Sequence, residues 1–118
     1  AELAAKAMST TGGYTKREIK TVKHMILDTT LLMDDCAQIS NTELSPYLLD
    51  ADLSNLGRQC FWEQTEAVAS EAGIPFSDFL PISLGLMERH SWQSDVGCQL
   101  YEQQKQRNIA DLKSRLNQ

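Results

Sequence analysis

The chain has 118 residues, enough for one hydrophobic core but too few for a core and a second independent module. Hydrophobic residues make up 42% and charged residues 23%, which is typical of a folded globular protein and excludes a wholly disordered one. The formal net charge of −5 argues against non-specific binding to nucleic acid or anionic lipid, because both require a basic surface.

Residues 1–14 are predicted to form a flexible or short helical segment that precedes a single helical domain of residues 15–118. The alanine-rich start, AELAAKAM, favours about two helical turns, and Gly12 and Gly13 end them. Thr15 and Glu18 have the spacing of a capping box, so a helix should begin at Lys16. Apolar residues at helical spacing extend this helix to about residue 39.

Two leucines on this helix, Leu27 and Leu31, lie off its apolar stripe and among charged residues. The charges also oppose the helix dipole, with Lys20 near the amino end and Asp34 near the carboxyl end. Antiparallel pairing of two copies that cross near Leu27 would set Lys20 of one copy against Asp34 of the other. We therefore expect a homodimer that forms through these four residues; the alternative is a solvated face on which such small penalties are tolerated.

A further helix, or a pair of short turns, is expected to begin at Ser45 and Pro46, because serine caps helices and proline is favoured at the first helical position. Its main run is predicted over residues 52–72, with Gly73 as the stop. Trp62 points away from the apolar face of this run. A tryptophan in that position is either partly covered by loops or available to a partner.

Residues 74–92 are the most apolar part of the chain. A helix over residues 77–90 would spread its apolar side chains over about 200° of its circumference, about twice what one buried face needs. Pro81 is expected at the first position of the regular helix, with a kink near Leu80. A strand also fits the alternating leucines, but Pro81 and Gly85 weaken a strand interior. We expect part of the apolar set to contact another protein; the set is Phe79, Leu80, Ile82, Leu84, Leu86 and Met87.

The last predicted helix begins at Ser91 or Ser94 and runs to about Leu116, with a polar interruption over residues 102–108. These elements predict an all-α, single-domain bundle of about four helices with an optional short N-terminal one.

No residue pattern indicates a catalytic, cofactor or metal site. His24 and His90 are the only imidazoles, no cysteine carries a nucleophile signature, and no Cys or His spacing matches zinc or di-metal motifs. A glycine-rich phosphate loop is also absent. His24 with Asp28, four residues apart, and His90 near a helix end are expected to be ordinary structural groups.

Three widely spaced cysteines, Cys36, Cys60 and Cys98, are typical of reduced, buried thiols in a cytoplasmic protein. The alternative is one disulfide and one free thiol in a periplasmic or secreted protein. The chain starts at Ala1 rather than methionine, which leaves a removed signal peptide open. No run reaches the roughly 20 apolar residues that span a bilayer.

We predict a non-enzymatic regulator that binds a protein partner through apolar helical surface, without cofactor, membrane or direct nucleic-acid contact. In size, acidity and predicted helical content, the chain resembles the small anti-activators that bind and disable bacterial quorum-sensing transcription factors. The resemblance aligns no motif and assigns no residue; it implies a cytoplasmic bacterial protein that sequesters or inhibits a transcription factor. The alternative is an exported, disulfide-containing helical accessory or immunity protein.

Overall fold

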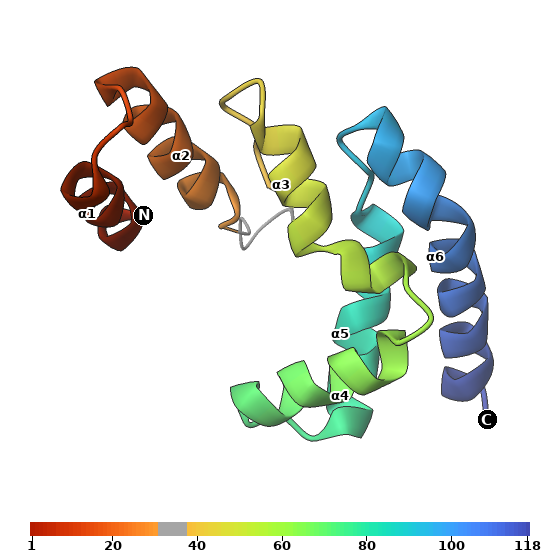
Figure 1. Cartoon of the computed structure of the whole chain (residues 1–118). Helices are drawn as coiled ribbons and strands as arrows, with labels where there is room; N and C mark the ends of the chain where they lie inside the picture. Colours follow the sequence, from red (N-terminus) through yellow and green to blue (C-terminus); the bar gives the residue numbers. More distant parts are fainter. Residues whose placement is uncertain (31–37) are drawn as a thin grey trace. The chain divides into compact units, whose positions relative to one another are not determined.

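The computed structural model describes residues 1–30 and 38–118, and all secondary structure within these ranges is helical (Figure 1). The all-α prediction is therefore confirmed, and the strand alternative for the central stretch is wrong. The chain divides into two compact units, Ala1–Leu49 and Asp50–Gln118, which are described separately. The described ranges contain six α-helices and a 3-10 helix, more than the four principal helices predicted. The optional N-terminal helix forms, and residues 45–72 form three helices in place of one main run.

The first unit begins with α1 (Glu2–Thr11) and α2 (Lys16–Asp28), which contact each other. The predicted capping box of α2 is confirmed: Thr15 Oγ1 accepts from the Glu18 N–H at 3.1 Å, and Glu18 Oε1 accepts from the Thr15 N–H at 2.8 Å. Glu2 and Lys23 form an ion pair between the two helices. Four amides at the start of α2, counted from the capping residue Thr15, lack a helical partner, and the box satisfies two of them, those of Thr15 and Glu18.

Helix α2 ends at Asp28, so its predicted extension to residue 39 is wrong. The Thr29 hydroxyl donates to the Ile26 carbonyl at 2.6 Å, and the Thr29 carbonyl accepts from Gln38 Nε2 at 2.6 Å. These bonds satisfy carbonyl groups that a continuing helix would have used. Gln38, nine residues after Thr29, thus takes part in ending the helix. The spacing of apolar residues in the sequence does not indicate such a contact.

The buried carboxylate of Asp28 ties the returning loop to the end of α2. It accepts from the Asn41 N–H and from the Ser45 hydroxyl, each at 2.7 Å, and also from the Asn41 amide. Burial alone would raise the pKa of Asp28, but these hydrogen bonds and the nearby His24 outweigh it, and the pKa is lowered. Asp28 therefore belongs to this loop network, and His24, four residues earlier on α2, also acts on its carboxylate.

The prediction of a helix start at Ser45 is confirmed by α3 (Ser45–Asp52), but the uninterrupted run over residues 52–72 is wrong. A 3-10 helix, η1 (Ser54–Gly57), and then α4 (Phe61–Ala72) follow. Asn108 of the last helix donates to the carbonyl groups of Leu56 at 2.9 Å and Arg58 at 3.0 Å. Because these two carbonyl groups accept from a side chain of the last helix, they are not used in a continuous α-helix, and the predicted run is interrupted here. The predicted stop at Gly73 is confirmed, with a left-handed φ of 70°.

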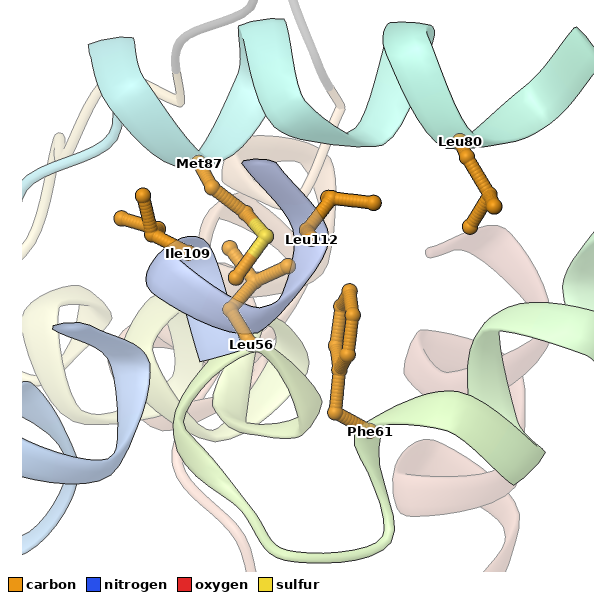
Figure 2. Packing of buried hydrophobic residues seen from close by; sticks show 6 residues of the cluster. All are labelled: Leu56, Phe61, Leu80, Met87, Ile109 and Leu112. Carbon is orange, nitrogen blue, oxygen red and sulfur yellow. The ribbon is translucent and has the colours of Figure 1, made fainter. Parts of the chain in front are cut away.

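The core of the second unit lies between η1, α4, α5 (Phe76–Arg89) and α6 (Asp95–Leu116), as Figure 2 shows. Helix α6 begins with the predicted cap at Ser94, whose Oγ accepts from the Gly97 N–H at 3.0 Å. Each of the four elements contributes at least one buried apolar side chain. These are Leu56, Phe61, Leu80, Met87, Ile109 and Leu112.

Candidate functional site

Helix α5 confirms the predicted central helix but not the position of its proline. The helix begins at Phe76, directly after Pro75, and Pro81 lies inside it. Pro81 has no N–H to donate to the carbonyl of Ser77, so one rung of the helical ladder is missing. The sequence predicted Pro81 at the first helical position, but the structure has Pro75 as the residue that precedes the helix.

One face of α5 packs into the core and another lies open to solvent. Leu80 and Met87 keep only 8% and 1% of their surface exposed, and Leu84 packs against the same cluster. Ile82 is 56% exposed, and Phe79 beside it is partly buried. The six residues singled out from the sequence therefore separate into a core set and an outer set.

We call Phe79, Ile82 and Leu86 the outer strip. Their spacing of three and four residues places them on one side of the helix. Leu86 is partly buried and, like Leu84, packs against the core cluster, so Ile82 is the exposed residue of the strip. Alongside it, the Arg89 Nε–H donates to the Gly85 carbonyl at 3.1 Å. Apolar side chains bordered by polar groups are typical of a surface that a partner covers.

Trp62, the other partner-binding candidate, is partly buried and belongs to the margin of the core. Its ring lies edge-on to Phe61, with ring centroids 5.3 Å apart. The Arg115 guanidinium stacks over the indole at 4.0 Å from its centroid. One face of Trp62 is therefore occupied by α6, which leaves the outer strip as the more open of the two candidate surfaces.

The junction between α5 and α6 holds a polar network that the sequence did not predict. Lys105, which is 3% exposed, places its ammonium nitrogen 2.7 Å from the His90 carbonyl oxygen and 3.0 Å from His90 Nδ1. Trp92 packs edge-on against the His90 ring at 4.4 Å and donates from Nε1 to Glu102 Oε2 at 2.7 Å. Glu102 also lies 3.8 Å from the Lys105 nitrogen. These four side chains form one connected cluster, which we call the junction network.

Burial changes the titration of this network. Burial, with the charge of Lys105 as a second cause, lowers the pKa of His90 to about 4, although Asp50 and Glu102 act in the opposite direction. Burial also lowers the pKa of Lys105, against the charges of Glu102 and Cys98. His90 is therefore neutral at pH 7.

Asp50 fixes the loop that follows the junction network. Its carboxylate, 4% exposed, accepts from the Gln93 N–H at 2.8 Å, from the Ser94 N–H at 2.9 Å and from the Ser94 hydroxyl. A Cβ added at Gly97 would overlap this carboxylate, so Gly97 allows Asp50 to lie directly against the start of α6.

The sequence contained one signal for the buried lysine of the junction network. Lys105 lies at helical spacing from Ile109 and Leu112, on the side of α6 that is otherwise apolar and buried.

Comparison with known proteins finds no match. No protein-family model, curated protein sequence or solved structure matches this chain.

Residues 1–30 and 38–118 contain no group of three or more His, Cys, Asp or Glu residues that could hold a metal ion. The helices within these same ranges include none that is long and apolar enough to span a membrane. Cys60 and Cys98 are free and exposed, which differs from the buried thiols expected, and Cys36 lies outside the described residues.

Two of the four residues predicted to mediate self-association can be placed. Lys20 is exposed on α2, and Leu27 is 52% exposed in its last turn. Leu31 and Asp34 lie outside the described residues. The pairing of Lys20 with Asp34 was derived for one continuous helix, and that basis is lost because α2 ends at Asp28.

Proposed function

We propose that this protein is a non-enzymatic regulator that binds and sequesters or inhibits another protein through the outer strip of α5. The partner proposed is a transcription factor, as for the bacterial anti-activators that the chain resembles. The single observation that supports the proposal is the exposure of Ile82, at 56%, on a helix whose opposite side carries the buried Leu80 and Met87.

A helix with apolar anchors three and four residues apart can lay that face into a groove on its partner. Phe79, Ile82 and Leu86 have this spacing on α5. Because Leu80 and Met87 hold the other side of the helix in the core, the strip is presented on a rigid support. Such a helix loses little conformational entropy on binding, which favours affinity.

Replacement of Ile82 with glutamate tests the proposal. The expected result is a free energy of unfolding within about 0.5 kcal/mol of the parent value, because the side chain is already largely exposed. Binding of the partner captured from native cells should weaken about 30-fold, equivalent to about 2 kcal/mol for a hot-spot residue. Urea unfolding and titration of the purified partner measure the two quantities.

Two variants provide matched controls. Val68→Glu introduces the same side chain at another exposed apolar residue, on α4, and should leave binding unchanged. Leu80→Glu places a charge in the core and should unfold the second unit. Equal binding by the parent and the Ile82→Glu variant would contradict the assignment of the strip.

The proposal includes a homodimer formed through Leu27. This part is supported by the exposure of Leu27, at 52%, beside Lys20 and Lys23 on α2. A large apolar side chain is unfavourable in water, so a contact that buries it would be stabilising. Sedimentation of Leu27→Glu should show a monomer that keeps its helix content by circular dichroism. Leu3→Glu, at an 81% exposed leucine of α1, is the control and should remain dimeric. A parent protein that sediments as a monomer would exclude the dimer.

A further inference from the structure

The junction network constrains the protonation of His90 by geometry alone. An ammonium group has hydrogen atoms to donate and no lone pair to accept. Because the Lys105 nitrogen lies 3.0 Å from His90 Nδ1, this ring nitrogen must carry a lone pair and the ring proton must be on Nε2. A second proton, on Nδ1, would point an N–H at the ammonium group.

The lysine has no alternative position within this network. Its side chain is 3% exposed, and its nitrogen also donates to the His90 carbonyl at 2.7 Å. Protonated His90 would therefore set two positive charges 3.0 Å apart where little water screens them. The imidazolium and the ammonium cannot both remain in place.

We propose that the α5–α6 junction is an acid-responsive latch, closed while His90 is neutral and opened when His90 gains a proton. Opening separates His90 and Trp92 from Lys105 and leaves the helices themselves formed. The Trp92 indole donates to Glu102 and lies 5.7 Å from the Lys105 nitrogen, so opening removes these two contacts, whereas its packing against the His90 ring is kept.

The other charged groups at the latch do not remove the conflict. Glu102 is 3.8 Å from the Lys105 nitrogen, but its two oxygens also accept from Trp92 and Gln106. The charge of Asp50 favours protonated His90, yet its carboxylate is occupied by Gln93 and Ser94. Cys98 acts on Lys105 and favours its charged form. The pKa of Glu102 is lowered overall: burial would raise it, but the bonds from Gln106 and Trp92 and the charge of Lys105 lower it.

The direction and range of the pH dependence follow from linkage. His90 in the closed state has its pKa lowered from 6.5 to about 4, whereas the open state has the ordinary value. The open state therefore binds the proton first as the pH falls below 6.5. The ratio of open to closed molecules should rise about tenfold per pH unit until pH 4, about 300-fold in all.

Trp92 fluorescence measures the opening in a Trp62→Phe protein, in which Trp92 is the remaining tryptophan. We expect a step in emission on titration from pH 7.5 to 3.5, with its midpoint below 6.5 and unchanged far-ultraviolet circular dichroism. NMR of the imidazole should show His90 titrating over the same range. Loss of helix content in parallel with the fluorescence step would mean global acid unfolding and would overturn the latch.

Two variants separate the latch from general acid effects. His90→Gln has no titrating ring and should lack the step above pH 4.5. Lys105→Met removes the opposing charge but leaves His90 buried, so the pKa of His90 should rise while staying below 6.5, and its titration should no longer shift the Trp92 emission. The inference fails if His90→Gln keeps the parent step, or if His90 in the parent titrates at its ordinary pKa.

Discussion

Replacement of Asp50 with alanine should lower the free energy of unfolding of the second unit by about 3 kcal/mol. The carboxylate accepts from the Gln93 and Ser94 amides and from the Ser94 hydroxyl, and it is 4% exposed. Alanine leaves these donors without an acceptor at a site where water has little room. Ser94 also caps α6, so the loop and the first turn of that helix should loosen together. Urea unfolding followed by Trp92 fluorescence measures the loss.

Two further variants distinguish this anchoring role from a simple change of charge. Asp50→Asn keeps one carbonyl oxygen as an acceptor and should recover part of the stability. Glu66→Ala removes an exposed acidic group from α4 and should change the stability by less than about 0.5 kcal/mol. If Asp50→Ala and Glu66→Ala were equally stable, the anchor would have no energetic importance.

Replacement of Gly57 with alanine should destabilise the second unit by about 3 kcal/mol, because the added methyl group has no space. A Cβ at this position would lie 2.9 Å from the Tyr101 carbonyl carbon and would overlap its carbonyl oxygen and Cβ. These are mainly backbone atoms of α6, which cannot turn aside as a side chain would. Helix α6 and η1 would have to separate, and the bonds of Asn108 to Leu56 and Arg58 would lengthen.

Gly85 provides the same substitution in an open setting. The nearest atom to a Cβ there is the terminal nitrogen of Arg89 at 3.4 Å, at the end of a flexible side chain. Since Gly85 lies inside α5, Gly85→Ala should stabilise the protein by about 0.5 to 1 kcal/mol. Opposite shifts in the urea midpoint are therefore expected for the two variants. A stable Gly57→Ala protein would show that η1 and α6 are less closely packed than described.

The outer strip and the latch lie at different places in the second unit, and their tests are independent. The strip is centred on Ile82, whereas the junction network begins at His90, directly after the end of α5. A change of Ile82 should not alter the titration of His90. Loss of the latch would leave the proposed partner surface untouched.

The sequence alone determined those features that depend on neighbours within about one helical turn. The capping box at Thr15 and Glu18, the cap at Ser94 and the left-handed stop at Gly73 each follow from local bonds. The all-α class also follows, because helical periodicity is a property of each segment by itself. The presence of α5 and its excess of apolar surface could be predicted for the same reason.

The tertiary structure decided which of these local possibilities were realised. Periodicity did not separate Leu80 from Ile82, because only the packing of α4 and α6 selects the buried side of α5. The breaks in the predicted long helices depend on Gln38 and Asn108, side chains that come from other segments to satisfy backbone carbonyls. The burial of Lys105 likewise needs His90 and Glu102 to be brought beside it. Hydrogen bonds and burial between distant residues depend on the assembled fold, so local pattern could not supply them.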